Sequence, residues 1–233
     1  MGKDLPRERP DRASNPRKFG PSQASVHVAP GQTEGQVVSV MRSILGRPRA
    51  ALREAANLAG APDDAMVEVS VVPRHGRRAI QIRAENAATN LRILLYQGFD
   101  GKRIVENEQI DVTETRRGQG IGTRQLARQV EQARRLGIAE IQGYAARNDE
   151  TGDVGYLVWP LLGFEGVLPR DILERLPDNL SAARRVSELI QDVDGRRWWR
   201  EHGDSLAVFF DLGPRSRAVR WLRAYLRRKR FSS

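Results

Sequence analysis

The sequence predicts an α+β fold in which a mixed, mostly antiparallel sheet is flanked by helices. Four segments between residues 65 and 112 alternate apolar and polar residues with the period of two that is typical of strands. A glycine-rich turn follows, then an amphipathic segment with a period near 3.6, and then another strand-like segment. A strand, a turn, a helix and a strand in this order make a βαβ unit, which adds a parallel strand to the antiparallel ones.

The N-terminal third predicts a leader followed by two helices. Residues 1–30 are rich in Pro, Arg, Ser and Asn and have little to bury, so we expect them to be disordered. Thr33 is suited to cap a helix that begins near Glu34. Pro48 is suited to open a second helical segment, which the Gly60-Ala-Pro sequence ends.

The strands and the later helices follow from the same reasoning. The alternating segments are residues 65–72, 79–84, 91–96 and 103–112. The sequence Gly98-Phe-Asp-Gly101 predicts the hairpin between the third and the fourth. A helix begins after Gly122 and ends at Gly137, and residues 138–144 form the next strand. We expect short helices at 171–176 and 180–193, a strand at 206–212, and a basic amphipathic helix within residues 214–233.

Composition narrows the class of protein. Hydrophobic residues make up 39% of the 233-residue chain and charged residues 29%, an ordinary balance for a globular protein. No apolar run approaches the roughly 20 residues that span a bilayer. The N-terminus lacks the apolar core of a secretory signal, and cysteine is absent, so we expect a cytoplasmic protein without disulfides. The three scattered histidines show no metal-ligand spacing, and we expect no metal site.

The net charge of +10 is concentrated at the two ends of the chain. Residues 214–233 contain eight basic residues and no acid, and residues 1–30 carry +3, which leaves residues 31–213 at −1. We therefore divide the chain into a leader (1–30), one domain (31–213) with a helical insertion at about 169–203, and a basic C-terminal helix (214–233).

The segment from Arg117 to Gly122, Arg-Gly-Gln-Gly-Ile-Gly, joins the fourth strand to the amphipathic helix. Backbone N–H groups at a helix start have no intrahelical partners, and glycines let an anion approach them closely, so a pyrophosphate is a suitable ligand. A Walker loop needs Gly-Lys-Ser/Thr, which is missing. A dinucleotide-binding turn needs G-x-G-x-x-G and an acidic residue ending the next strand, whereas that strand ends here in Tyr144-Ala-Ala. A glycine-rich turn without a ligand is the other alternative.

Arg117, Gly120 and Gly122 match R/Q-x-x-G-x-G/A, and this segment resembles the phosphate-binding motif of the GNAT acetyltransferase superfamily. The sequence from Trp159 to Phe164 resembles that family's aromatic-x-x-x-Gly-Phe signature, and the resemblance covers roughly residues 63–168. It implies that acetyl-CoA is bound where two strands separate. The residues that it assigns to this cofactor are Asp111, Val112 and Thr113 beside the pantetheine, Arg117, Gly118, Gln119, Gly120, Ile121, Gly122 and Thr123 at the pyrophosphate, and Asn148.

Amide formation from a thioester needs a base for the amine and a proton donor for the leaving thiolate. Glu106 and Glu108 lie two residues apart on the fourth strand and are the candidate bases; each is alternatively a solvent-facing or ion-paired strand residue. The family usually has a tyrosine where this chain has Trp159. Tyr156, one helical turn earlier, is the candidate donor, with a role as a core aromatic as the alternative.

The sequence thus favours an N-acetyltransferase acting on a primary amine of a small molecule, a protein or an aminoacylated RNA. The alternative is a GNAT-like binding or structural module with little catalysis, which contacts nucleic acid or an acidic partner through its basic C-terminal helix. That helix is alternatively docked on the core with a solvated basic rim. Trp198 and Trp199 favour an anchor for the insertion over a stacking surface for bases.

Overall fold

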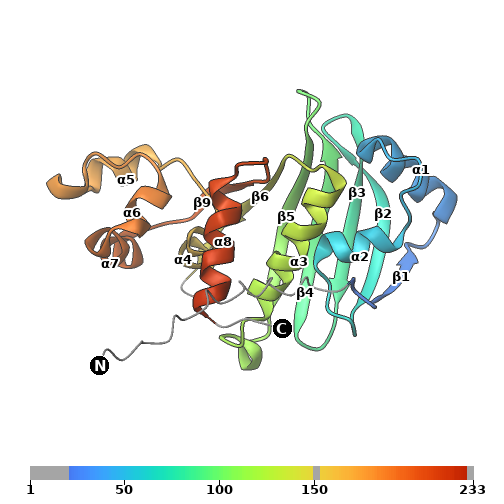
Figure 1. Ribbon diagram of the computed structural model, residues 1–233, viewed down its shortest axis with the longest axis horizontal. Coiled ribbons are helices and arrows are strands. Elements are labelled where there is room, and N and C mark those ends of the chain that lie inside the picture. The colour runs from blue at the N-terminus through green and yellow to red at the C-terminus, as the bar shows by residue number, and fades with distance from the viewer. Residues whose placement is uncertain (1–20, 149–152, 230–233) are drawn as a thin grey trace, which may run out of the picture.

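The structure is a computed structural model and describes residues 21–148 and 153–229. One mixed sheet of seven strands runs through it in the order β1-β2-β3-β4-β5-β6-β9 (Figure 1). Strands β2 to β5 and the pair β6-β9 are antiparallel, whereas β1 is parallel to β2 and β6 to β5. The predicted fold class, a mostly antiparallel mixed sheet flanked by helices, is confirmed. The strands are β1 (Ser25–Val28), β2 (Met66–Arg74), β3 (Arg77–Glu85), β4 (Thr89–Gln97), β5 (Arg103–Val112), β6 (Glu140–Ala145) and β9 (Leu206–Asp211).

The helices end where the sequence supplies caps. Thr33 forms a reciprocal capping box with Gln36 at the start of α1. Gly137 adopts φ +72° at the end of α3, a left-handed conformation that favours glycine, and its N–H bonds to the carbonyls of Ala133 and Arg134. The helices beside the sheet are α1 (Glu34–Leu45), α2 (Arg53–Ala59), α3 (Ile121–Leu136) and α8 (Arg217–Arg228).

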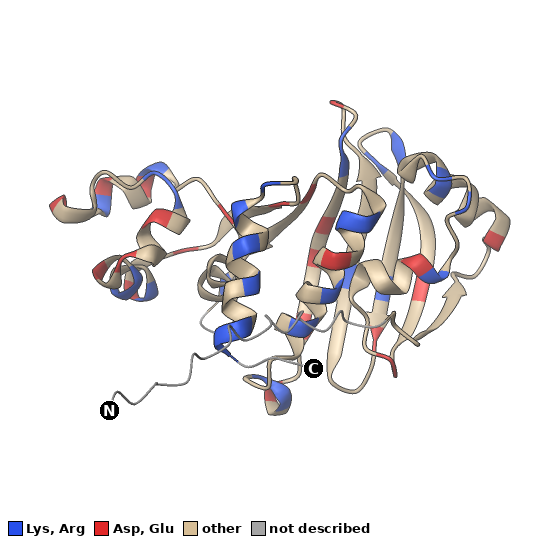
Figure 2. Cartoon of the chain, viewed as in Figure 1, with Lys and Arg blue, Asp and Glu red and all other residues tan. Residues whose placement is uncertain are grey.

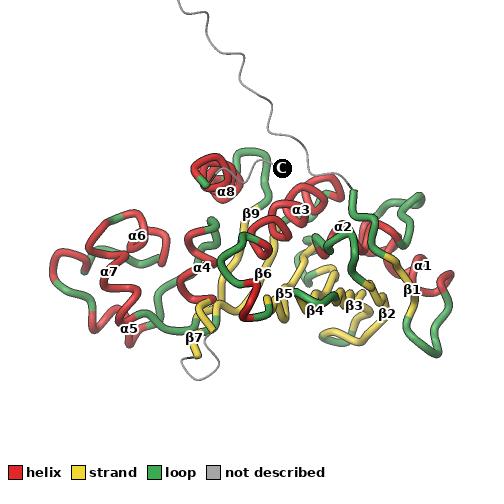
Figure 3. Tube along the Cα trace, turned by 90° about the horizontal axis from the view of Figure 1, so that it is seen from below, coloured by secondary structure: helices red, strands yellow, loops and turns green. Residues whose placement is uncertain are grey.

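Figure 3 shows these four helices on one side of the sheet. Their apolar faces share a single core with the buried residues of the strands. The other face of β2 to β5 is polar and, within the described residues, carries no helix. Alternation along the strands therefore decides which side chains face the core and which face solvent.

Between β6 and β9 the chain forms a small hairpin and then the inserted helices. The insertion is fastened by Trp199, whose buried indole N–H donates to the carbonyl of Tyr156 at 3.0 Å. This contact shows that Trp199 anchors the insertion, while Trp198 is partly buried beside His202 of the same helix. The elements between β6 and β9 are β7 (Arg147–Asn148), β8 (Asp153–Val154), α4 (Gly155–Leu161), α5 (Arg170–Arg175), the 3-10 turn η2 (Asp178–Leu180), α6 (Val186–Gln191) and α7 (Val193–His202). A further 3-10 turn, η1 (Glu114–Arg116), lies between β5 and α3.

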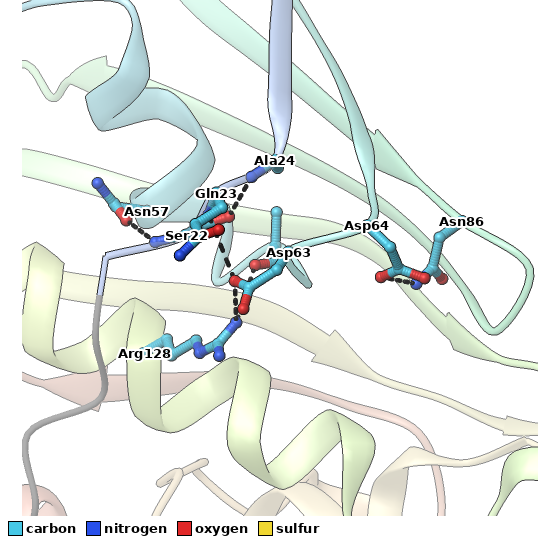
Figure 4. A network of polar contacts seen from close by, with 9 residues as sticks. Ser22, Gln23, Ala24, Asn57, Asp63, Asp64, Asn86 and Arg128 are labelled. Atoms are coloured by element: carbon cyan, nitrogen blue, oxygen red, sulfur yellow. Dashed lines mark hydrogen bonds and ion pairs between the residues drawn. The ribbon is translucent and has the colours of Figure 1, made fainter.

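Polar contacts hold β1 and its approach against the helices (Figure 4). The Asn57 side chain accepts a hydrogen bond from the Ser22 N–H at 2.6 Å. The Asp63 carboxylate accepts from the Gln23 N–H and pairs with Arg128 of α3, both at 3.3 Å. These contacts join the first strand to α2 and α3.

Three expectations differ from the structure. Residues 25–28 form an edge strand instead of belonging to a disordered leader, because they pair with β2 and the polar contacts above fix the residues before them; residues 1–20 lie outside the described residues. The second helix begins at Arg53 and not at Pro48, since the Arg42 side chain binds the carbonyl of Ala50 and shapes the intervening turn. The helix expected at 180–193 is divided into η2, α6 and the first residue of α7, because Asp192 is extended and caps α7.

Within the described ranges, no helix is long and apolar enough to cross a membrane.

Candidate functional site

Strands β5 and β6 separate partway along their length. They are paired from Ile104 to Asn107, opposite Glu140 to Gly143, and the pairing ends there. Strand β5 continues to Val112 while pairing only with β4, and β6 continues to Ala145 while pairing only with β9. Beyond Asn107, the β6-facing edge of β5 therefore has backbone N–H and C=O groups without a strand partner. We call this opening the fork.

A buried polar pair fixes α3 to β5 at the fork. The Asn107 amide donates to Gln129 at 3.0 Å, and the Gln129 amide donates back to Asn107 at 2.8 Å. Both residues are less than 5% exposed, so each amide depends on the other for its hydrogen bonds. The pair ties the helix to the last residue of β5 that still pairs with β6.

The glycine turn lies between the end of β5 and the start of α3. Gly118 and Gly120 adopt φ values of +76° and +73°, which other residues rarely adopt. The Arg117 side chain donates to the carbonyl of Val112 at 3.2 Å, and the Thr113 N–H donates to the carbonyl of Ala88 at 2.9 Å. The turn is thereby held against the end of β5.

The start of α3 provides donors for an anion. The N–H of Arg124 makes the first helical hydrogen bond, to the carbonyl of Gly120 at 3.0 Å, and no side chain caps this end. The N–H groups of the preceding residues thus have no intrahelical acceptor. The Arg124 guanidinium donates to the carbonyl of Gln119 at 3.0 Å, which brings a positive charge to the turn. Together with the helix dipole, this arrangement favours a phosphate.

Both candidate bases are ion-paired on the sheet face opposite α3. Glu106 contacts Arg74 at 2.5 Å, and Glu108 contacts Arg92 at 3.1 Å. Glu106 lies in the paired part of β5, opposite Gln142. Glu108 is the extra residue of a β-bulge opposite β4 and lies just beyond the last β5–β6 pair, in the open part of the fork. A polar groove of about 460 Å³ lies on this sheet face. It is lined by Arg92 and by Gln109, the residue that follows Glu108 in the chain.

Tyr96 extends the polar cluster around Glu106. Its hydroxyl donates to Gln142 at 3.2 Å, and the Arg74 guanidinium lies 5.8 Å from its ring centre. Burial, and secondly the Glu106 carboxylate, raise the pKa of Tyr96 above its ordinary value of 10.0. The phenol therefore stays neutral at physiological pH.

Tyr156 and Trp159, both in α4, have structural contacts. The Tyr156 hydroxyl donates to the carbonyl of Arg200 at 3.0 Å, and the residue is 6% exposed. Its proton is thus engaged in holding α7. The Trp159 ring lies edge-on to Phe164 with ring centres 4.5 Å apart, and beside Gly143, the last β6 residue of the paired region.

The other predicted cofactor residues lie at different places in the fold. Asp111 is on the unpaired length of β5 and accepts a hydrogen bond from Gln109 at 2.5 Å. Thr123 is half-buried in the first turn of α3. Asn148 is in β7, opposite Asp153. Residues 107–123 are thus brought together at the fork and the turn, while Asn148 belongs to a separate hairpin.

Sequence reasoning missed Tyr144. It follows Gly143 on β6, just beyond the last pair with β5, and is 64% exposed. An aromatic residue at the end of a strand, directly after a glycine, was the available signal.

Within the described residues, no group of three His, Cys, Asp or Glu side chains is arranged to hold a metal ion.

No family model matches the sequence, and no curated protein matches it. Among solved structures, this chain is similar to Arabidopsis thaliana Naa50 in complex with the bisubstrate analogue CoA-Ac-MVNAL. The identity is 16%, the TM-score is 0.33, and the match covers 55% of this chain and 70% of that one. A similarity at this level does not establish a shared fold.

Proposed function

We propose that the protein is an N-acetyltransferase that uses acetyl-CoA and acts on a primary amine. The observation that carries the proposal is the combination of the fork between β5 and β6 with the glycine turn that leads from β5 into α3. An acyl-CoA has a pyrophosphate, an amide-bearing pantetheine arm and a thioester. The glycine turn suits the pyrophosphate, and the unpaired edge of β5 suits the pantetheine arm. The part of the fork beyond Asn107, where β5 and β6 no longer pair, suits the thioester.

The residues fit this cofactor in both shape and polarity. At Gly118 an added Cβ meets no atom within 4 Å, so a bulky phosphate can approach the backbone. The first-turn N–H groups of α3 and the Arg124 guanidinium supply positive potential. Between Glu108 and Asp111, the β6-facing edge of β5 offers backbone groups that can pair with the pantetheine amides as an added strand does, whereas the Thr113 N–H is already bonded to the Ala88 carbonyl.

Bound acetyl-CoA supplies the activated acetyl group, and the chain must then accept a proton from the amine. We assign this role to Glu108, because it lies in the open part of the fork, and retain Glu106 as the alternative. The polar groove lined by Arg92 and Gln109 lies on the same sheet face as Glu108, and we assign the approach of the amine to this face. Tyr144, an exposed residue just beyond the last β5–β6 pair, is the proton donor that we favour for the leaving thiolate.

A second candidate is a CoA-binding module without catalysis. The Tyr156 hydroxyl is bonded to a backbone carbonyl, and Trp159, which stands at the family's usual tyrosine position, offers only an indole N–H. Neither residue is therefore well suited to donate a proton to the leaving thiolate of CoA. This candidate shares the cofactor site with the first and differs only in turnover.

The two candidates are separated by release of free CoA from acetyl-CoA in the presence of peptides, polyamines and small amines, with product masses recorded. Transfer should fall by about 10²–10⁴-fold in Glu108→Gln if Glu108 is the base. Glu85→Gln is the matched control, since Glu85 is an exposed carboxylate that lines the groove but lies on β3, away from the fork. CoA binding without transfer to any amine would favour the module. Equal losses in both variants would contradict the assignment of Glu108.

A further inference from the structure

Helix α8 presents a row of cations to solvent. We call Arg220, Arg223, Arg227, Arg228 and Lys229 the α8 basic face; all five are exposed. Figure 2 shows basic bands along this helix and no acidic ones. The spacings of three and four residues place most of the row on one side of the helix.

The basic face is electrostatically uncompensated within the described residues. None of its five cations makes an ion pair there. The exposed arginines of α5 differ, because Arg170 pairs with Glu174 and Arg175 with Asp171. Like charges three and four residues apart destabilise a helix by a few tenths of a kcal/mol per pair. The helix dipole accounts for cations in the last turn, but not for Arg220 and Arg223.

The other side of α8 packs against the core. Val219 and Leu222 are about 5% and 2% exposed, and the Trp221 indole N–H donates to the carbonyl of Leu161 at 2.9 Å. The helix is therefore docked on the core, and its basic face has a fixed direction. The row thus forms a preorganised surface and not a flexible charged tail.

This packing distinguishes between kinds of anionic partner. A helix that binds a membrane surface must insert its apolar face into the lipid, whereas the apolar residues of α8 face the core. No large hydrophobic side chain of α8 is among the strongly exposed ones of the described chain. Four of the five cations are arginines, whose planar guanidinium matches phosphate with two parallel hydrogen bonds.

We propose that the α8 basic face binds the phosphate backbone of a nucleic acid, without reading its bases. Contacts to phosphates release counterions, so affinity falls with salt as the number of contacts dictates. Three to five contacts give a slope of log K against log salt of about −3 to −4.5, and about a 10²-fold loss between roughly 50 and 200 mM salt. The proposal is independent of the acetyl-CoA site.

The test is fluorescence anisotropy of the full chain with a labelled mixed-sequence duplex of about 20 base pairs and with a single-stranded RNA of similar length, over a salt series. The variant is the triple substitution Arg220→Gln, Arg223→Gln and Arg227→Gln. The matched control is Arg170→Gln, Arg175→Gln and Arg197→Gln, which removes the same charge from exposed arginines of α5 and α7. Circular dichroism melts establish that each variant is folded.

We expect the α8 triple variant to lose about 10²-fold in affinity at low salt and its slope to shrink by about 3. The control variant removes the same three positive charges, and its affinity should stay within about twofold of the wild-type affinity. Equal losses in the two triple variants, or no binding by the wild type at about 50 mM salt, would overturn the proposal. Tighter binding to phosphatidylserine vesicles or polyglutamate than to either nucleic acid would also overturn it.

Discussion

The buried amide pair between Asn107 and Gln129 offers a quantitative test of how α3 is held at the fork. Replacing Gln129 with Met keeps the side-chain length but leaves both polar ends of the Asn107 amide without a partner. Each buried orphan group costs about 1–3 kcal/mol, so the single change, which orphans two groups, should lower the free energy of unfolding by about 2–6 kcal/mol. Asn107→Leu should cost a similar amount, because it orphans the Gln129 amide.

The double variant Asn107→Leu with Gln129→Met leaves no orphan. Replacing both partners of a hydrogen bond by apolar groups is nearly neutral, so the double variant should be at least about 2 kcal/mol more stable than the sum of the single losses predicts. Urea denaturation of all four proteins, with a constant m value, measures this coupling. Additive losses, or single variants that cost less than about 0.5 kcal/mol, would refute the reciprocal pair.

Three further predictions concern backbone contacts and tyrosines. Gly60→Ala should destabilise by about 2–5 kcal/mol in urea denaturation, because it combines left-handed strain with a Cβ placed 2.2 Å from the carbonyl oxygen of Gln125. Gly76→Ala, at φ +72° with open space, should cost only about 1–2 kcal/mol, and equal losses would contradict the close approach of α2 and α3. Since the folded-state pKa of Tyr96 is raised, the neutral phenol contributes stability that is present below pH 10.0 and is lost as pH rises through the folded-state value. The difference in absorbance at 295 nm between wild type and Tyr96→Phe should therefore titrate above pH 10.0, and titration at or below it would be inconsistent with this environment. Tyr156→Phe should lower stability by about 1–2 kcal/mol while leaving any acetyl transfer unchanged, and a selective loss of transfer would instead assign Tyr156 to catalysis.

Local patterns in the sequence predicted most of the elements because caps and alternation are local. Residues 103–112 were predicted with the bounds that β5 has, since apolar alternation and the preceding turn both mark it. The end of α3 was equally clear, because Gly137 supplies the left-handed cap. Strand β1 was missed, since its four residues acquire their structure by pairing with Met66–Val69 of β2, far along the chain.

The candidate site was predictable only in part. The glycine spacing indicated the turn, but the point where β5 and β6 separate depends on the register of a parallel pair, which no single segment specifies. The ion pairs of Glu106 and Glu108 with arginines of β2 and β4 also required the cross-strand register. Tyr156 illustrates the same limit, because its hydrogen-bond partner lies 44 residues away.

Calorimetric titration of acetyl-CoA and free CoA into the protein tests the central claim most directly. Gly118→Glu places a carboxylate beside the expected pyrophosphate. Gly101→Glu introduces the same charge at φ +80° in the β4–β5 hairpin, and is the matched control. We predict that wild type and Gly101→Glu bind both ligands, and that Gly118→Glu binds neither. Failure of the wild type to bind, or unchanged binding by Gly118→Glu, would contradict an acyl-CoA site at the glycine turn.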